Sequence, residues 1–212
     1  MPSYQPMPVM VKICGITNLQ DALHAAQAGA DALGFVFWEQ SPRHVSIPKA
    51  AEVVKALPPL VKVGVFVDAP EELVYRAISE CDLNVLQFHG QESPEYCSQF
   101  GLMSMKAFRV RDRDSLKALP EYHTEAWLLD AYSPDKPGGT GERFNWDLAL
   151  EAQKLGRPIF LAGGLTSENV AEAVSRVHPY AVDVSSGVEA SPGKKDPQKV
   201  IAFVRAAKSV LE

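Results

Sequence analysis

Residues 11–17, VKICGIT, contain the unit from which the fold can be predicted. A short apolar strand, Val9 to Ile13, leads directly into Cys14 and Gly15, and Asn18 then stands where a helix would begin. In α/β proteins, active sites are built at the carboxyl ends of parallel strands. The thiol of Cys14 is therefore expected at such a strand end, as a potential base.

The same alternation of strand and helix patterns recurs along the whole chain. Several of the apolar runs are almost continuous in Val, Leu, Ile and Phe, which is typical of parallel strands covered on both faces. Eight strands are predicted: Val9–Ile13, Ala32–Phe37, Val61–Val67, Val85–Phe88, Met103–Phe108, Ala126–Leu129, Ile159–Ala162 and Ala181–Val184.

Helix signals stand between these runs. Helices are expected to begin at residues that accept or tolerate the unpaired amides of a first turn, namely Asn18 before LQDALHAAQAG, Pro70 in PEELVYRAISE, Ser93 before PEYCSQFG and Ser167 before ENVAEAVSRV. Gly29, Gly101 and Gly156 stand where helices should end.

Eight strands, each followed by a helix, predict a single (β/α)₈ barrel over residues 9–212, after an N-terminal extension at residues 1–8. The competing architecture is a doubly wound open sheet, which usually has about five or six strands. The count of eight favours the closed barrel.

The composition is that of an ordinary globular domain: 212 residues, 46% hydrophobic and 22% charged, with a formal net charge of −5. Disorder is therefore excluded, and the interspersed charges argue against a nucleic-acid partner. No stretch reaches the length of a membrane span. The three cysteines, Cys14, Cys81 and Cys97, lack Cys-x-x-Cys spacing, which indicates a cytoplasmic protein without disulfides or a zinc site.

A carboxyl group, like the thiol, stands at the end of a predicted strand. Asp130 closes the run AWLLD and precedes PGGTG at residues 137–141. A thiol and a carboxyl at two strand ends indicate a proton-transfer enzyme. Backbone amides of Gly15 and of the following helix start are expected to lower the pKa of Cys14. A general acid must be held protonated, and the loop at residues 134–143 could close over Asp130 and exclude water.

Two glycine-containing segments follow the last two predicted strands and indicate an anion site. Gly163 and Gly164 follow the seventh strand, and Ser185, Ser186 and Gly187 follow the eighth. In (β/α)₈ barrels these two loops commonly bind phosphate through backbone amides and a short helix start. A nucleotide-binding P-loop motif is missing from the sequence.

Six segments, in order, resemble the phosphoribosylanthranilate isomerase family: KICGIT (12–17), SPRHVS (41–46), LQFHG (86–90), LLD (128–130) before GGTGE (138–142), LAGGL (161–165) and VDVSSGVE (182–189). The resemblance implies an Amadori rearrangement in tryptophan biosynthesis, acting on a small phosphorylated substrate. It implies Cys14 as the general base and Asp130 as the general acid, with no metal or organic cofactor.

The resemblance also places Arg43 against the anthranilate carboxylate, for which a planar bidentate donor is suited. Gln87 and His89 alternate around a phenylalanine and are expected to line the barrel mouth, and Gly141 is expected to contact the substrate. Asp183 is expected either to accept a substrate hydroxyl or to form an ion pair inside the barrel. The sequence leaves a monomer and a weak homodimer equally open.

Two alternatives use the same barrel differently. Lys12 shares strand parity with Cys14 and should point inward, so a lyase or aldolase that forms a Schiff base on this lysine is one alternative. We favour a structural lysine paired with a carboxylate. The other alternative is a noncatalytic protein that binds phosphorylated metabolites.

Overall fold

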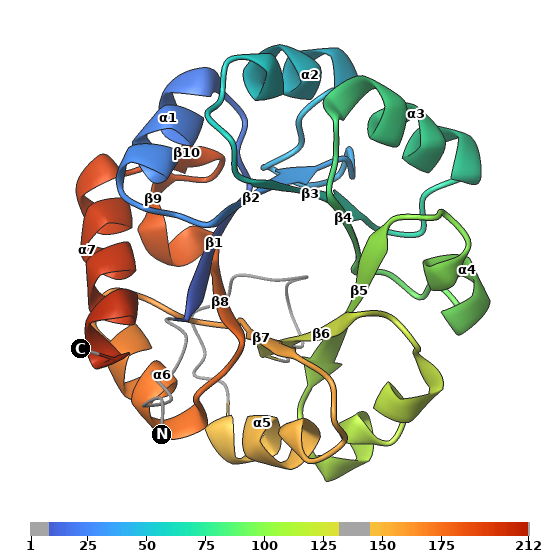
Figure 1. Cartoon of the computed structure of the whole chain (residues 1–212), viewed down its shortest axis with the longest axis vertical. Helices are drawn as coiled ribbons and strands as arrows, with labels where there is room; N and C mark the ends of the chain where they lie inside the picture. Colours follow the sequence, from blue (N-terminus) through green and yellow to red (C-terminus); the bar gives the residue numbers. More distant parts are fainter. Residues whose placement is uncertain (1–8, 132–144, 212) are drawn as a thin grey trace, which may run out of the picture.

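The computed structural model describes residues 9–131 and 145–211 and has a closed barrel at its centre. Eight parallel strands follow each other around the barrel in chain order, and pairing of β1 with β8 closes it (Figure 1). The strands are β1 Met10–Cys14, β2 Ala32–Val36, β3 Val61–Phe66, β4 Val85–Phe88, β5 Met103–Val110, β6 Ala126–Ala131, β7 Ile159–Leu161 and β8 Ala181–Val184. The prediction of a (β/α)₈ barrel is confirmed.

Helices surround the barrel and cover its outer face (Figure 1). They are α1 Leu19–Gln27, α2 Ile47–Lys55, α3 Glu71–Cys81, α4 Pro94–Ser98, α5 Trp146–Gln153, α6 Val170–Val177 and α7 Pro197–Lys208. The side chains of Asn18 and Ser93 accept amide hydrogen bonds at the starts of α1 and α4, as expected. Gly29, Gly101 and Gly156 adopt positive φ where these helix patterns end.

Two helix predictions are wrong in detail. Helix α6 begins at Val170 rather than directly after Ser167, because Asn169 folds back and hydrogen-bonds the backbone of Thr166 and Gly164. Residues 111–125, between β5 and β6, contain two 3₁₀ helices instead of an α-helix, namely η1 Arg113–Leu116 and η2 Leu119–Glu121. Asp112 caps η1 and Pro120 stands early in η2, so each turn is short.

A small hairpin that the sequence analysis did not predict lies between β8 and α7. The 3₁₀ helix η3 (Ser186–Val188) follows β8 and leads into β9 (Glu189–Ser191), which pairs antiparallel with β10 (Lys194–Lys195). In Figure 1 this hairpin lies between α1 and α7, on the outside of the barrel wall, and its turn contacts the loops that follow β1 and β2: Thr17 donates to the carbonyl oxygen of Gly193, and a methyl on Gly193 would lie 2.7 Å from the carbonyl oxygen of Pro42. It therefore brings residues from the end of the chain to the first strands.

The barrel interior changes from apolar to reactive along the strand direction. Residues two apart point the same way, so Lys12 and Cys14 of β1 face inward, as do Leu128 and Asp130 of β6. An apolar layer below the mouth contains Ala32, Val63, Met105, Ala107, Leu128, Phe160 and Ala181. Cys14 and Asp130 thus reach the interior at its carboxyl end.

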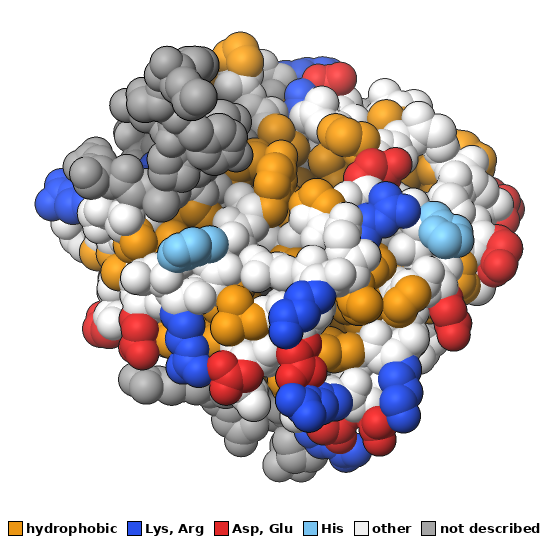
Figure 2. Space-filling view, turned by 60° about the horizontal axis from the view of Figure 1, so that its bottom comes forward, with side chains coloured by type: hydrophobic (Ala, Val, Ile, Leu, Met, Phe, Trp, Pro, Cys, Tyr) orange, Lys and Arg blue, Asp and Glu red, His pale blue; other side chains and the backbone are white. Residues whose placement is uncertain are grey.

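Acidic and basic side chains are mixed on the outer surface, and the face in Figure 2 shows no area of a single sign. Neighbouring helices carry exposed ion pairs such as Arg76–Glu80 and Arg176–Asp147. Within the described part of the chain, no helix has the length and apolar character needed to cross a membrane.

Candidate active site

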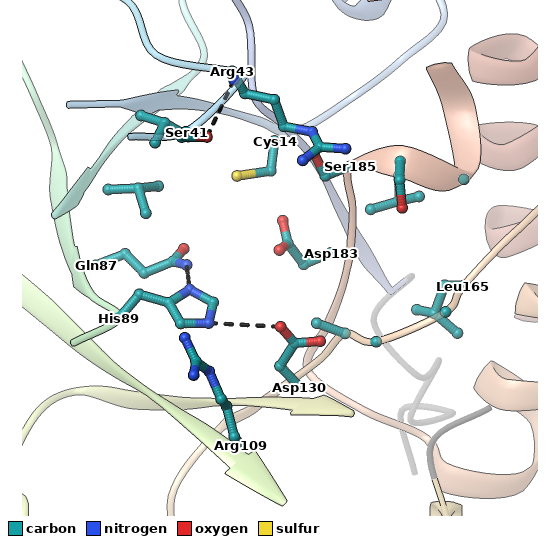
Figure 3. Close-up of a pocket in the computed structure, with 18 of the residues that line it drawn as sticks. Cys14, Ser41, Arg43, Gln87, His89, Arg109, Asp130, Leu165, Asp183 and Ser185 are labelled. Carbon is teal, nitrogen blue, oxygen red and sulfur yellow. Dashed lines mark hydrogen bonds and ion pairs between the residues drawn. The ribbon is translucent and has the colours of Figure 1, made fainter. Parts of the chain in front are cut away.

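A cavity opens at the carboxyl end of the barrel, and strands from opposite sides supply its walls (Figure 3). Cys14 and Asp183 project from β1 and β8 on one side, and His89 and Asp130 project from the other. The floor of the cavity includes Val36 and Val65, and Ala162. Closure of the barrel thus brings to one cavity a thiol and a carboxyl that are far apart in the sequence.

Cys14, the last residue of β1, is buried against Gly34 of β2. A methyl group on Gly34 would lie 2.7 Å from Sγ of Cys14 and 3.2 Å from Nζ of Lys12, so the missing side chain makes room for both. The amides of Gly15 and Ile16 both donate to the carbonyl oxygen of Gly34. The amide of Gly15 is thus not directed at the thiol, and the pKa of Cys14 is raised, chiefly by burial, so the expectation of a lowered thiol pKa is wrong.

Charge near the thiol comes from Lys12, which lies one inward position below Cys14. Its ammonium is buried and donates to Oδ1 of Asp183 at 2.6 Å. Burial raises the pKa of Cys14, and Lys12 opposes that rise. Burial also works against the charge on Lys12, but Asp183 and Cys14 together outweigh it and the pKa of Lys12 is raised. Lys12 is thus held as a cation beside the sulfur.

Asp183 therefore takes the second of its two expected roles, an ion pair inside the barrel. It also lines the cavity, so it is in reach of a ligand there.

The other two cysteines lie outside the cavity, in the apolar core. Cys81 ends α3 and Cys97 lies in α4, and both are fully buried among apolar side chains. Burial raises the pKa of Cys81 to about 11 and that of Cys97 to about 12. Both therefore act as small apolar residues of the core.

Asp130 is contacted by His89, which in turn is hydrogen-bonded to Gln87 of β4. The side-chain amide of Gln87 lies 3.2 Å from Nδ1 of His89, and Nε2 of His89 lies 3.5 Å from Oδ2 of Asp130. With Gln87 donating to Nδ1, the imidazole hydrogen is on Nε2 and faces the carboxylate. Oε1 of Gln87 is buried with no partner among the described residues, so it is available to a ligand donor.

The loops after β7 and β8 approach each other closely enough to exclude side chains. Gly163 and Gly164 adopt positive φ one after the other, and a methyl on Gly187 would overlap the carbonyl oxygen of Leu165. Ser185 and Ser186 line the cavity beside these glycines at the start of η3. Oγ of Ser185 is buried with no partner among the described residues. All five predicted phosphate-site residues therefore border one cavity.

Arg43 reaches the cavity from the loop after β2. Its backbone amide bonds Oγ of Ser41, and its guanidinium is fixed by Glu189 at 2.8 Å from both Nε and Nη2. In Figure 3 its guanidinium end lies beside Cys14 and Ser185. The structure thus brings the predicted anion-binding arginine to the mouth and adds a carboxylate partner that the sequence analysis missed.

Arg109 is a lining residue that the sequence analysis did not select. Strand β5 runs to Val110, two residues beyond the predicted end, and Arg109 is in register with Asp130. The alternation Met105, Ala107, Arg109 was the available signal. Lys106 of the same strand points outward and pairs with Glu92 at 2.9 Å. Gly141 lies outside the described residues.

The fold and this cavity define a class: (β/α)₈ barrels with reactive side chains and an anion cradle at the carboxyl mouth. Within that class, residues 11–206 match the sequence profile described as N-(5'-phosphoribosyl)anthranilate (PRA) isomerase. The chain belongs to this family.

Relatives and solved structures agree with that assignment. The N-(5'-phosphoribosyl)anthranilate isomerase of Geobacter sp. (strain M21) is 58% identical over 201 residues, covering 94% of this chain and 98% of the relative. The crystal structure of phosphoribosyl anthranilate isomerase from Thermotoga maritima has a TM-score of 0.90 at 42% identity, with 95% and 99% of the two chains covered. Another isomerase structure, in complex with reduced 1-(o-carboxyphenylamino)-1-deoxyribulose 5-phosphate, has a TM-score of 0.86 at 41% identity, with the same coverage.

Proposed function

We propose that, in the isomerisation that this family carries out, Cys14 is the general base and Asp130 is the general acid. N-(5'-phosphoribosyl)anthranilate would become 1-(2-carboxyphenylamino)-1-deoxyribulose 5-phosphate. The observation that carries the proposal is the placement of one thiol and one carboxyl on opposite walls of a single cavity.

The two groups fit the two proton transfers that the rearrangement needs. Asp130 gives a proton to the furanose ring oxygen, and the ring opens to a Schiff base. Cys14 then removes the proton from C2 of the sugar, and its electron pair passes toward the nitrogen to form an enolamine. The enolamine tautomerises to the ketone, so the atoms of substrate and product are the same.

Lys12 supports the base rather than forming a covalent intermediate. An aldolase lysine must be a neutral amine to attack a carbonyl. The ammonium of Lys12 is instead paired with Asp183 at 2.6 Å, and Asp183 and Cys14 together raise its pKa against the larger single effect of burial. A cation in this position favours the thiolate of Cys14.

The loops after β7 and β8 are assigned to the substrate phosphate. Gly163, Gly164 and Gly187 let the backbone approach an oxyanion, and Oγ of Ser185 and the amide of Ser186 at the start of η3 are suitable donors. The unpartnered hydroxyl of Ser185 supports this role.

The remaining lining residues are assigned by their chemistry. Arg43 would bind the anthranilate carboxylate, while Gln87 and His89 would contact the sugar and orient Asp130. Gly141 retains its predicted substrate contact. A small phosphorylated substrate, a cytoplasmic location and independence of metals and organic cofactors complete the proposal.

Turnover of enzymatically generated phosphoribosylanthranilate, followed by the change in anthranilate fluorescence, tests the proposal. Conversion that disappears in both Cys14→Ala and Asp130→Asn is expected. Binding without conversion by the wild-type chain would favour a noncatalytic binding protein. A stable adduct on Lys12 after borohydride treatment with substrate would favour the aldolase alternative.

A further inference from the structure

The guanidinium of Arg43 is held along one edge only. Nε donates to Oε1 and Nη2 donates to Oε2 of Glu189, both at 2.8 Å. A guanidinium has five N–H donors. This bidentate pair uses two of them, so the edge formed by Nη1 and the second hydrogen of Nη2 is not used by Glu189. That outer edge has the fork geometry that a second carboxylate requires.

Glu189 itself is fixed by the β9–β10 hairpin. The amide of Gly193, at the hairpin turn, lies 3.3 Å from Oε1 of Glu189, and its carbonyl oxygen accepts from Thr17 at 2.6 Å. A methyl on Gly193 would lie 2.7 Å from the carbonyl oxygen of Pro42. The hairpin turn therefore packs directly against the loop that carries Arg43.

The stem of Arg43 is also confined on the side of the barrel. A methyl on Gly15 would lie 2.9 Å from Cδ of Arg43 and 3.1 Å from Oγ of Ser185. The arginine thus lies between the first strand and the hairpin, with its side chain 17% exposed. Confinement on both sides fixes which edge of the guanidinium is left for a ligand.

A second cation restores the charge that Glu189 would otherwise cancel. Lys195 of β10 has its ammonium 3.0 Å from Oε1 of Glu189 and 3.2 Å from the carbonyl oxygen of Ser185, and its side chain is only 1% exposed. Burial works to raise the pKa of Glu189, but Arg43 and Lys195 outweigh it and that pKa is lowered. Arg43, Lys195 and Glu189 together carry one net positive charge. Of these three residues, Arg43 is the one that borders the cavity.

We infer that Glu189 and Lys195 are positioning residues that prepare Arg43 for a substrate carboxylate. Glu189 fixes the inner edge of the guanidinium, and Lys195 keeps the group cationic overall. The inference rests on the proposed function, which assigns Arg43 to the anthranilate carboxylate. It adds that recognition of this carboxylate depends on two residues of the hairpin that do not touch the substrate.

A comparison of ligands that differ by one anionic group tests the inference. Calorimetry would give dissociation constants for reduced 1-(o-carboxyphenylamino)-1-deoxyribulose 5-phosphate, for the same compound without its carboxyl group, and for the same compound without its phosphate. The ratio of the first two constants is the carboxylate preference. The variants are Arg43→Ala, Glu189→Gln, Lys195→Met and the double variant Arg43→Ala/Glu189→Gln.

Wild type is expected to prefer the carboxylated compound by about a hundredfold, since a bidentate charged pair is the strong kind of hydrogen bond. Arg43→Ala should abolish the preference. Glu189→Gln and Lys195→Met should each reduce it by about tenfold while affinity for the compound without carboxyl stays unchanged. The double variant should show no loss beyond that of Arg43→Ala. In turnover, KM should rise and kcat should change little.

Lys106→Met is the matched control, because Lys106 is also a buried lysine paired with a glutamate, at 2.9 Å from Glu92. It should leave the carboxylate preference unchanged. If Glu189→Gln fails to fold, Lys195→Met carries the same test, because it leaves both hydrogen bonds from Arg43 to Glu189 possible.

Each failure has its own signature. If Arg43→Ala keeps the preference, the proposed contact of Arg43 is wrong, and the inference falls with it. If Arg43→Ala loses the preference but the Glu189 and Lys195 variants keep it, only the inference is overturned. Equal weakening of all three compounds would mean that Glu189 is merely structural. The inference would also be overturned if the loss of affinity in these variants depended on the phosphate group of the compound instead of its carboxyl group.

Discussion

The two walls of the cavity hold their reactive groups by different means. On the β1–β8 wall, Lys12 and Asp183 form a buried ion pair at 2.6 Å directly below Cys14. On the β4–β6 wall, Asp130 meets His89 at 3.5 Å, and the side chain of His89 is 20% exposed. The first wall is held by a short, buried ion pair, while the second is held by longer contacts through a partly exposed histidine, although Asp130 itself is 7% exposed, as buried as Cys14 at 8%.

This difference matches the demands of the two proposed roles. A thiol must be made more acidic in a buried place, and only a fixed neighbouring cation can offset burial there. A general acid must be reloaded with a proton after each turnover, and the partly exposed His89 is the neighbour of the buried Asp130 that lies nearer to solvent. We therefore expect substitutions on the first wall to depend on pH through Cys14, and substitutions around Asp130 to have smaller effects.

The largest effects are expected from the two reacting groups themselves. Cys14→Ala and Asp130→Asn should each lower kcat by about a thousandfold, the middle of the range for general acid–base catalysis. Affinity for the reduced product analogue should stay within a few-fold of wild type, which calorimetry can measure. Cys97→Ala is the matched control, because that thiol is fully buried outside the cavity. Near-normal turnover in either site variant would remove its residue from the mechanism.

Lys12→Met should have the next largest effect, lowering kcat by about ten- to a hundredfold at neutral pH. Burial raises the pKa of Cys14 and Lys12 opposes the rise, so removing the cation moves that pKa further up. The base works as thiolate, so the rate rises with pH through this pKa. The rising limb of the rate profile should therefore move to higher pH in the variant. Rates of thiol alkylation against pH measure the same shift.

In Lys12→Met, the destabilisation caused by leaving Asp183 without its buried partner must be distinguished from the effect of removing the positive charge beside the sulfur of Cys14. Lys106→Met removes a buried lysine from Glu92 without touching Cys14, so it reports the general cost of such a change, about 3–5 kcal/mol of stability. The double variant Lys12→Met/Asp183→Asn removes both charges of the first pair and limits that cost. An unmoved rate profile in both Lys12 variants would show that Lys12 has only a structural role.

A smaller effect is expected at the loops after β7 and β8, which form the proposed phosphate site. Gly187→Ala would force the loops after β7 and β8 apart, because its methyl overlaps the carbonyl of Leu165. Binding of inorganic phosphate should weaken by about tenfold, as expected when amides lose their alignment to an oxyanion. Replacing Gly164, at a φ of 68°, by a bulky residue should act in the same direction. Gly101→Ala, at a helix end with open space around it, is the control. Equal phosphate affinity in all these variants would show that the loops after β7 and β8 do not bind the phosphate.

The smallest effect is expected at His89. Its contact with Asp130 is long, so His89→Ala should lower kcat by only about three- to tenfold, as for one modest hydrogen bond. Steady-state kinetics with wild type and Asp130→Asn as references gives the comparison. If kcat fell as far in His89→Ala as in Asp130→Asn, Asp130 would depend on its neighbour as strongly as Cys14 is expected to depend on Lys12. The contrast between the two walls would then be wrong.

The local elements of the fold could largely be predicted from the sequence. Continuous apolar runs bounded by turn residues located all eight strands, and Asn18 and Ser93 marked true helix starts. The prediction for the region between β5 and β6 was wrong. It extended the alternation of strands and helices to residues 111–125, but Pro120 and the cap at Asp112 keep the turns there short. Strand ends were less certain, so Arg109 was missed.

For the candidate site, the residues themselves were within reach of the sequence, but their partners were not. Cys14, Asp130 and the paired glycines stand at strand ends that the apolar pattern locates. The amides expected around Cys14 turned out to bond Gly34 of the neighbouring strand. The carboxylate that pairs with Lys12 and the carboxylate that pairs with Arg43 lie 171 and 146 residues away along the chain.

By itself, the sequence determined the elements of a (β/α)₈ barrel and the residues at its strand ends, because burial pattern and turn chemistry act over a few neighbouring residues. Only the tertiary structure decided which charges stand next to which. Closure of β1 against β8 places Asp183 on Lys12, and the folding of the hairpin places Glu189 on Arg43. Such electrostatic partners depend on distances in space, which a linear pattern does not contain.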